Sequence, residues 1–197
     1  MWLSNVPMQH STFSGRPNWN DNYWVHTRVM QLFGDLSSAA LARRNGDILY
    51  RVEPGIGLGR VLVQSSVRPL APEISTVDTS GILNALDDGA SLQFHIKLNS
   101  TKTANRTSEG ITTRTRVVIP EDELAEWVIS KLSPGLSSLD IETLDPSVER
   151  QRKTPIAVVV VSGKAVVVDS AALTDMIKHG VGKARAFGCG LLSVIPT

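Results

Sequence analysis

The stretch HGVGKARAFGCGLLSV, residues 179–194, places two glycine pairs directly before the last apolar run of the chain. Glycine allows a positive φ and a close approach of neighbouring backbone, so this pattern predicts a tight connection from a helix to a strand. Two interpretations of this connection are open. It can serve only to reverse the chain between the helix and the strand, or it can also present backbone N–H groups and cations to phosphates. The residues concerned are Gly180, Gly182, Gly188 and Gly190, with Lys183 and Arg185 between the pairs.

The known nucleotide-binding fingerprints do not fit this stretch. No segment has the form G-x-x-x-x-G-K-[ST], and Arg185 stands where a dinucleotide fingerprint requires its third glycine. The stretch also precedes a strand, whereas that fingerprint follows one. We therefore expect no nucleotide cofactor, and the sequence predicts no other cofactor.

The segments before the glycine pairs alternate between strand and helix. A helix is expected from residue 170 to about residue 179, capped by Asp169 or Ser170. Valine-rich strands at 156–161 and 164–169 flank Ser162-Gly163, which we interpret as a two-residue hairpin turn. We also expect a strand at 138–145 and a basic connector at 149–153. Pro120 should open another helix, whose buried stripe is Leu124, Trp127, Val128 and Leu132.

The first half of the chain shows a similar order. Residues 2–8 favour an edge strand, because Pro7 suits a central strand poorly. Strands are expected at 47–53 and 60–67, and the segment 91–99 alternates strictly between apolar and polar residues, with Leu92, Phe94, Ile96 and Leu98 on one face. A helix is expected over 22–33, capped by Asn20, Asp21 or Asn22.

This order of elements matches a ferredoxin-like unit. We therefore predict an α+β fold class with two tandem ferredoxin-like (RRM-like) halves and a glycine-rich loop near the C terminus. The N-terminal half should cover residues 1–99 and the C-terminal half residues 120–197, with a basic loop or hairpin at 100–119 between them.

The composition excludes several classes of protein. Hydrophobic residues make up 42% of the 197 residues, which is enough to form a buried core. The net charge of +1 gives no indication of a polyanionic partner. The single cysteine, Cys189, rules out an internal disulfide and a Cys-rich zinc site, and it suits a reducing cytoplasm. The start MWLSNVPMQH does not resemble a signal peptide, and no apolar run approaches the ~20 residues that cross a bilayer. We expect a cytoplasmic protein without a membrane partner.

The glycine pairs also carry a family resemblance. GVGKARAFGCG has the form G-h-G-x5-G-h-G, where h is apolar, and an apolar strand follows it. With MWLS at the start and YRVEP and VLVQS in the middle, this ending resembles the CasE family, the CRISPR-RNA-processing endoribonuclease of the type I-E Cascade complex. The resemblance implies a metal-independent endoribonuclease that cuts precursor CRISPR RNA at the base of the repeat stem-loop. It also implies that the product is retained within Cascade.

Two side chains of the first helix suit such a reaction. Tyr23 and His26 lie three residues apart on one helix face, so both can address one phosphate. By sequence alone, a histidine beside an apolar stripe is more often a partly buried structural side chain. In the family a Tyr-x-x-His pair on the first helix is catalytic, which implies these roles for Tyr23 and His26. Whether His26 acts as general acid or general base stays open, with Tyr23 orienting the 2′-hydroxyl or its phosphate.

Acidic residues are scattered along the chain, and no set of His, Asp and Glu has metal-ligand spacing, so no metal site is predicted. Cations form three groups, each of which alone is more often an ordinary solvated surface. The resemblance implies that region 100–116 enters the major groove of the repeat stem-loop, with the other two groups flanking the duplex. The groups are Lys97, Lys102, Arg106, Arg114 and Arg116; Arg150, Arg152 and Lys153; and Lys183 and Arg185.

One departure from the family bears on the cation at the scissile phosphate. Some members carry a lysine in the strand after the basic connector, but IAVVVV at 156–161 has none. Lys153 or Arg152 would then have to replace it.

Two other functions stay open at this point. The chain can be a non-catalytic CRISPR-RNA-binding structural subunit of the same complex. It can also be a small-molecule enzyme, because a ferredoxin-like scaffold does not fix function. The expected partners are the CRISPR repeat RNA stem-loop and other Cascade subunits.

Overall fold

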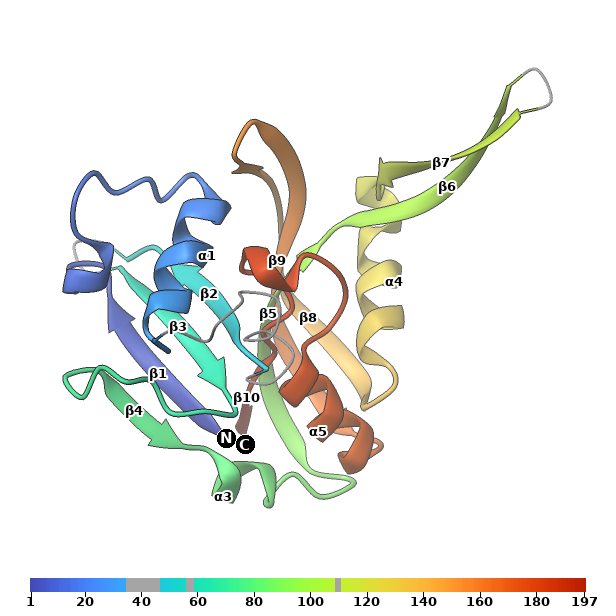
Figure 1. Ribbon diagram of the computed structural model, residues 1–197. Helices are drawn as coiled ribbons and strands as arrows, with labels where there is room; N and C mark the ends of the chain where they lie inside the picture. The colour runs from blue at the N-terminus through green and yellow to red at the C-terminus, as the bar shows by residue number, and fades with distance from the viewer. Residues whose placement is uncertain (35–46, 56–58, 109–110) are drawn as a thin grey trace.

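The computed structural model describes residues 1–34, 47–55, 59–108 and 111–197. They form two four-stranded antiparallel sheets and a two-stranded hairpin that projects away from both (Figure 1). The predicted turn between residues 53 and 60 lies partly outside the described residues. Within the described ranges, no helix has the length and apolar character needed to cross a membrane.

The first sheet has the strand order β2-β3-β1-β4. A short 3-10 helix, η1 (Ser11–Phe13), precedes helix α1 (Asn22–Gln31), whose Val25 and Val29 are fully buried against the sheet. This strand order, with α1 between the first two strands, is that of a ferredoxin-like unit. The strands are β1 (Trp2–Pro7), β2 (Leu49–Glu53), β3 (Arg60–Ser65) and β4 (Ser75–Asp78).

The second sheet repeats this order as β10-β5-β9-β8. Helices α4 (Glu121–Leu132) and α5 (Ser170–His179) cover one of its faces (Figure 1). The two sheets confirm the predicted α+β fold with two ferredoxin-like halves. The strands are β5 (Ser91–Asn99), β8 (Leu136–Gln151), β9 (Thr154–Val167) and β10 (Ser193–Pro196).

Three further elements lie outside the two four-stranded sheets. The hairpin of β6 (Thr101–Ser108) and β7 (Ile111–Val118) stands between β5 and α4, which confirms a hairpin in the basic region. Helix α3 (Ser80–Leu83) links the two sheets. The 3-10 helix η2 (Arg185–Phe187) lies between the two glycine pairs.

The three predicted helices begin at the residues that the sequence indicated, whereas α1 ends at Gln31, two residues before the predicted end at residue 33. The Asp21 side chain caps α1, Pro120 occupies the cap position of α4, and the Asp169 carboxylate accepts a hydrogen bond from the Ala172 backbone N–H at 2.8 Å. Helix α5 ends at Gly180, whose φ of +76° lies in the left-handed region.

Strand β5 occupies a place that the sequence did not reveal. It pairs with β9 and β10 at the centre of the second sheet, so the prediction that residues 91–99 complete the first half is wrong. Strand β4 takes the fourth place in the first sheet by pairing with β1. Alternation identifies a buried face but not a partner strand. The two halves therefore divide before β5 and not after residue 99.

Strand β1 is central, although its proline favoured an edge. It lies between β3 and β4, but β4 pairs only with Trp2 to Asn5. Pro7 therefore faces β3 alone, at the last register pair of the strand. No bond to β4 is lost there, so the missing N–H is tolerated.

Strand β9 runs unbroken through Ser162 and Gly163, so the predicted hairpin turn at these residues is wrong. The register of β8 against β9 shifts here, and a Cβ on Gly163 would lie only 2.1 Å from the carbonyl oxygen of Asp140. The glycine therefore serves a bulge in which two strands approach closely. Strand β8 also extends beyond the predicted 138–145, and it takes in residues 149–151 of the predicted connector.

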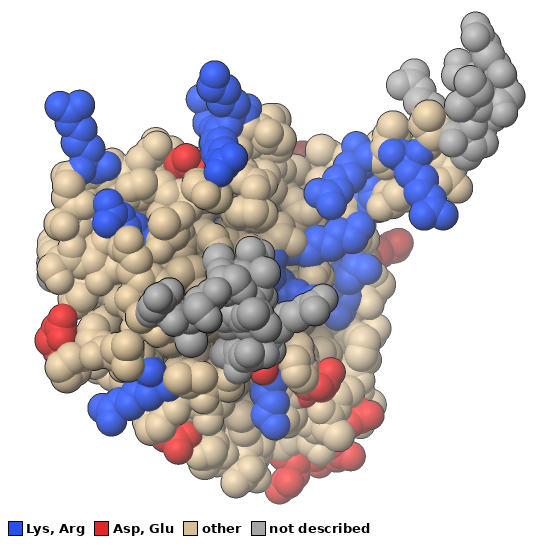
Figure 2. All heavy atoms as spheres, viewed as in Figure 1, with Lys and Arg blue, Asp and Glu red and all other residues tan. Residues whose placement is uncertain are grey.

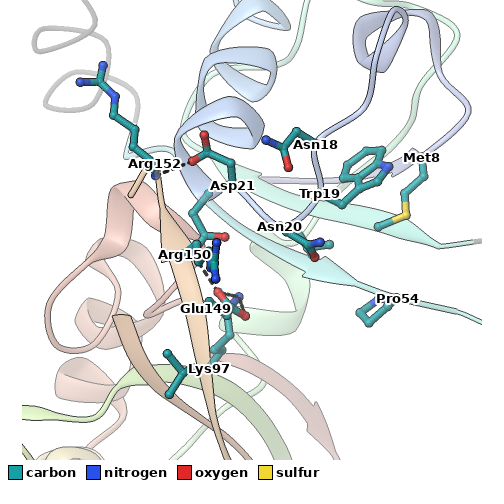
Figure 3. Close-up of a pocket in the computed structure, with 13 residues that line it drawn as sticks. Met8, Asn18, Trp19, Asn20, Asp21, Pro54, Lys97, Glu149, Arg150 and Arg152 are labelled. Carbon is teal, nitrogen blue, oxygen red and sulfur yellow. Dashed lines mark hydrogen bonds and ion pairs between the residues drawn. The ribbon is translucent and has the colours of Figure 1, made fainter. Parts of the chain in front are cut away.

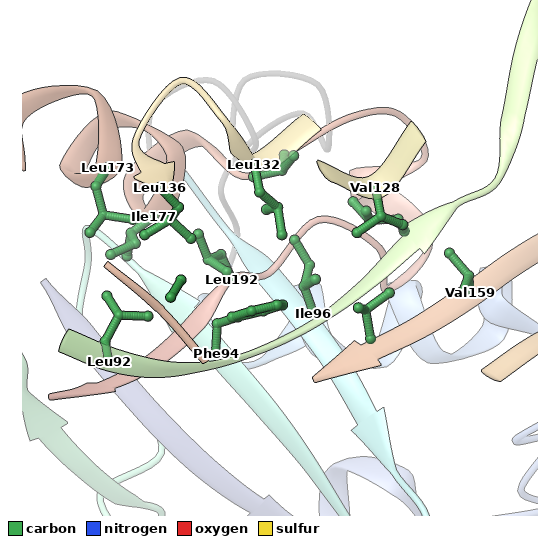
Figure 4. Close-up of a cluster of buried hydrophobic side chains, with 14 of the residues drawn as sticks. Leu92, Phe94, Ile96, Val128, Leu132, Leu136, Val159, Leu173, Ile177 and Leu192 are labelled. Carbon is green, nitrogen blue, oxygen red and sulfur yellow. The ribbon is translucent and has the colours of Figure 1, made fainter. Parts of the chain in front are cut away.

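The hydrophobic core of the second half lies between the second sheet and helices α4 and α5 (Figure 4). Leu92, Phe94 and Ile96 point from β5 toward the helices, as their alternation predicted, and each is at most 3% exposed. The helices contribute apolar side chains to the same layer, which fixes both helices on the sheet. These side chains include Leu124, Val128, Leu132, Leu173 and Ile177.

A buried arginine joins the two halves. Arg51 of β2 is 4% exposed and pairs with Glu53 at 2.6 Å. Its guanidinium also donates to the backbone carbonyls of His95 and Leu191 at 3.2 and 3.1 Å, and to the hydroxyl of Ser193 at 3.1 Å. These three acceptors belong to the second half. Because a buried charge needs all its partners, Arg51 fixes the position of one sheet relative to the other.

Candidate active site

The site forms where α1 of the first half meets the β8–β9 tip of the second half. The Asp21 carboxylate accepts hydrogen bonds from two backbone N–H groups, that of Tyr23 at 3.0 Å and that of Arg152 at 2.8 Å. Arg152 turns the chain from β8 into β9 with a φ of +54°. One carboxylate thus holds both the start of α1 and the turn that carries Arg152.

This anchoring places a cation over a phenol ring. The guanidinium carbon of Arg152 lies 3.9 Å from the centroid of the Tyr23 ring, within cation–π distance. Tyr23 is 40% exposed, and Arg152 is also exposed. Both side chains are therefore accessible to a ligand from solvent.

His26 lies one helical turn after Tyr23 and is only 7% exposed. Its ring is stacked on Tyr50, with centroids 6.3 Å apart, and meets Phe187 edge-on at the same distance. The imidazole nevertheless forms part of the wall of a cavity of about 610 Å³, which we call the α1 cavity. Its lining residues are Tyr23, His26, Thr27, Met30, Gln151, Arg152, Thr154 and Phe187.

Side chains behind the cavity hold its walls together. The Tyr50 hydroxyl lies 3.1 Å from the carbonyl oxygen of Asn22 and 3.2 Å from that of Ala186, so it connects α1 to η2. Sequence reasoning missed Tyr50 and Phe187, since nothing in a strand or in a glycine-rich loop marks an aromatic residue as a support for a histidine.

A second support is the carboxylate of Glu149. It accepts a hydrogen bond from the Asn22 side-chain amide at 2.8 Å and pairs with the Lys97 ammonium at 2.8 Å. Lys97 is 4% exposed, so it is turned into the molecule and does not face solvent as a candidate RNA contact would. The Lys97–Glu149 pair instead ties β5 to β8 beneath the start of α1.

The other three histidines lie away from the α1 cavity. His10 pairs with Glu73 at 3.0 Å, and His179 pairs with Asp175 at 2.8 Å. His95 is half-buried, and burial, together with the nearby Arg51, lowers its pKa below the ordinary value. Of the four histidines, His26 alone shares a cavity with Tyr23 and Arg152.

The hairpin divides its cations between two faces. Directly opposed residues of two strands share a face, so Arg114 lies beside Asn105 and Arg116 beside Thr103. The Lys183 ammonium reaches this face and donates to the Thr103 hydroxyl at 3.3 Å. We call the surface of Arg114, Arg116 and Lys183 the hairpin face.

The opposite face of the hairpin turns toward α4. The ammonium of Lys102 pairs there with Glu123 at 2.6 Å. The backbone of Arg106 lies in β6, but its side chain is outside the described part of the chain. Figure 2 shows that Lys and Arg gather along the hairpin and at its foot, whereas Asp and Glu gather at the opposite end of the same view.

The remaining cations border the site. Arg150 and Lys153 are exposed on either side of Arg152 at the β8–β9 tip. Arg185 is exposed at the start of η2, and its guanidinium donates to the carbonyl of His179 at the end of α5. The structure thus brings the β8–β9 tip and η2 to the wall of the α1 cavity. The hairpin face contributes no residue to that wall, and Lys183 connects it to the glycine-rich loop that carries η2.

The two glycine pairs lie close together in the glycine-rich loop. Gly180, Gly182, Gly188 and Gly190 all have a positive φ, and a Cβ on Gly190 would lie 2.7 Å from the carbonyl oxygen of Val181. The Val181 N–H donates to the carbonyl of Gly190 at 2.9 Å. The glycines therefore do make the tight return from α5 to β10 that the sequence predicted.

Among the described residues, no group of three or more His, Cys, Asp or Glu side chains is placed to hold a metal ion. Cys189 is buried, and burial raises the pKa of its thiol to about 12, so it is a neutral core residue.

Comparisons with a family model and with individual proteins point to the same family. The family model described as CRISPR associated protein matches residues 1–196. The chain is 31% identical over 192 residues to the CRISPR system Cascade subunit CasE of Escherichia coli K12, covering 89% of this chain and 92% of that protein. It is 24% identical over 223 residues to the CRISPR-associated endoribonuclease Cse3 of Thermus thermophilus, covering both proteins completely.

Solved structures support the same fold. A structure of CRISPR endoribonuclease Cse3 bound to 19 nt RNA has a TM-score of 0.76 at 23% identity and covers 100% of both chains. At this level of identity the structural similarity supports the fold, including both ferredoxin-like halves.

Proposed function

The chain belongs to the CRISPR-associated protein family, and from this premise we propose that it is an endoribonuclease that cuts precursor CRISPR RNA at the base of the repeat stem-loop. The relatives named above include a Cascade subunit and an endoribonuclease. The proposal includes retention of the cut stem-loop within Cascade, and with it a cytoplasmic location.

One observation carries the proposal: Tyr23, His26 and Arg152 share the wall of a single cavity. A phosphate in this cavity meets an imidazole, a phenol hydroxyl and a guanidinium. These groups supply a proton carrier, a hydrogen-bonding group and a positive charge, which are the parts that RNA cleavage without a metal needs.

The reaction begins with attack by the 2′-hydroxyl on the adjacent phosphorus. A base removes the hydroxyl proton, the new O–P bond forms, and the bond to the 5′-oxygen breaks as that oxygen receives a proton. The products are a 2′,3′-cyclic phosphate and a 5′-hydroxyl. We assign one of the two proton transfers to His26, because imidazole exchanges protons near neutral pH.

Tyr23 and Arg152 act on the phosphate in this scheme. The guanidinium of Arg152 stabilises the negative charge that develops on the pentacovalent phosphorane. The Tyr23 hydroxyl, held under Arg152, orients the 2′-hydroxyl or the phosphate. Arg152 therefore takes the place of the lysine that some family members carry in the following strand.

The hairpin face would bind the RNA stem. Arg114, Arg116 and Lys183 present positive charge on one surface next to the glycine-rich loop. A-form RNA is recognised mainly through its shape, its phosphates and its 2′-hydroxyls, which such a surface contacts. The stem end then lies toward η2, from where the strand enters the α1 cavity.

The test uses cognate repeat RNA in the presence of EDTA. We expect cleavage at one position, with a cyclic or opened 3′-phosphate on one fragment and a 5′-hydroxyl on the other. A single 2′-deoxy nucleotide before the cut should abolish cleavage and leave binding unchanged. Cleavage that needs a divalent metal, or that tolerates the 2′-deoxy nucleotide, would contradict the mechanism. Binding without any cleavage would favour the non-catalytic subunit instead.

A further inference from the structure

A second cavity lies beyond the N terminus of α1 and has a volume of about 700 Å³. It is within the ~300–1,000 Å³ range of small-ligand sites. Figure 3 shows the loop before α1, with Asn18, Trp19 and Asn20, on one side of it and Arg150 of β8 on the other. We call it the loop cavity. Arg152 lines both the loop cavity and the α1 cavity, so the two are neighbours.

The loop side of this cavity offers amide groups and an aromatic ring. Asn18 and Asn20 are exposed, and within the described residues neither amide side chain makes a hydrogen bond to protein. Trp19 is partly buried, with its ring 4.9 Å from the Phe13 centroid and 5.3 Å from the Trp24 centroid. The indole is thus held rigidly by packing while it lines the cavity.

The lining of the cavity carries charges of both signs. The carboxylate of Glu149 is already neutralised by Lys97, and that of Asp21 already accepts two backbone hydrogen bonds. Among the residues that the structure describes, Arg150 forms no ion pair with an acidic side chain. The guanidinium of Arg152 lies over the Tyr23 ring and points away from the loop cavity (Figure 3). The loop cavity therefore combines the guanidinium charge of Arg150 with amides and an aromatic wall.

We propose that the loop cavity binds the first single-stranded nucleotide on the leaving side of the scissile phosphate. This inference rests on the proposed function. The stem approaches from the hairpin face and η2, and neither contributes a residue to the loop cavity. An RNA strand that passes Tyr23, His26 and Arg152 from that side reaches the loop cavity next.

The side chains suit an unpaired nucleotide. Single-stranded bases are recognised by stacking on aromatic rings and by hydrogen bonds to their edges. Asn18 and Asn20 offer both donors and acceptors to a base edge, Trp19 forms the wall, and Arg150 meets the next phosphate. Holding the leaving nucleotide here also aligns its 5′-oxygen with the attacking 2′-hydroxyl across the α1 cavity.

The test compares the affinities of three RNAs. The first is the repeat stem-loop that ends at the cut in a 3′-phosphate. The second carries one more nucleotide, with a 2′-deoxy sugar before the cut to prevent cleavage. The third is the same extended RNA with an abasic last nucleotide. We expect the second RNA to bind about fivefold tighter than the first and the third, since a base-edge hydrogen bond contributes about this factor.

The variant Asn18→Ala/Asn20→Ala should remove that gain and bind the product RNA as tightly as the unsubstituted protein. Asn84→Ala, which replaces an exposed asparagine outside the cavity, should retain the gain. If the extended RNA binds no tighter than the product, or if the double variant keeps the gain, the loop cavity is not a nucleotide site. The proposed function stands in that case, because cleavage and its dependence on His26 are measured separately.

Discussion

Replacing Asp21 by alanine should damage both stability and cleavage. The Asp21 carboxylate accepts hydrogen bonds from the N–H groups of Tyr23 and Arg152, at 3.0 and 2.8 Å. Loss of a helix cap costs about 1 kcal/mol. The bond to Arg152 is charge-assisted but exposed, so we take the lower end of the usual range, about 1.5 kcal/mol. Asp21→Ala should therefore lower the free energy of unfolding by about 2.5 kcal/mol.

The effect on catalysis follows from the same two bonds. Without the Asp21 carboxylate, the Arg152 turn loses its hydrogen bond to the start of α1 and keeps the contact with Tyr23. The hydrogen bond from Asn22 to Glu149 and the backbone bridge at Arg150 hold β8 before the turn but do not reach Arg152 itself. A displacement of about 1 Å in a positioning group can reduce a rate about 100-fold. Single-turnover cleavage of repeat RNA by Asp21→Ala should fall by about this factor, at a temperature where the variant remains folded.

Urea unfolding and single-turnover cleavage, measured on the same preparations, check both effects. Asp21→Asn is the matched control, since asparagine caps helices as well as aspartate and keeps an acceptor oxygen. It should retain most of the stability and of the rate. An Asp21→Ala protein that loses the expected stability but cuts at the unsubstituted rate would refute the positioning role.

Other substitutions test separate parts of the structure. Arg152→Ala should reduce the single-turnover rate about 100- to 1,000-fold, and normal cleavage by this variant would remove the guanidinium from the mechanism. Arg116→Ala should lower the slope of log affinity against log salt by about one. Lys102→Ala should leave that slope unchanged, because α4 already neutralises this lysine; equal effects of the two would contradict the division of the hairpin into two faces. Gly163→Ala should cost about 3 kcal/mol of unfolding free energy, since its Cβ would lie 2.1 Å from a carbonyl oxygen of β8, whereas Gly81→Ala, with open space around it, should be neutral.

The helices could be predicted from the sequence because their ends are encoded locally. Asp21, Pro120, Asp169 and Gly180 each stand at the helix boundary that their chemistry favours. The Tyr23 and His26 pair could also be placed on one helix face, because their spacing alone decides this.

Long-range pairing could not be predicted in the same way. The alternation of residues 91–99 gave the buried face of β5 but not its sheet, since any strand edge satisfies the same pattern. Lys97 stands at a polar position of that strand, yet it is buried because Glu149, far along the chain, supplies its counter-charge. Ser162-Gly163 has the composition of a turn, and only the approach of β8 explains why a glycine stands inside β9.

The most direct measurement of the central claim is single-turnover cleavage of cognate repeat RNA by His26→Ala in EDTA, beside an affinity measurement with the same RNA. If the α1 cavity is where the phosphodiester breaks, cleavage should be lost while the affinity stays within about tenfold, because removing a proton carrier affects the chemical step and not the charged binding surface. A variant that still cuts at the unsubstituted rate would place the reaction elsewhere on the protein.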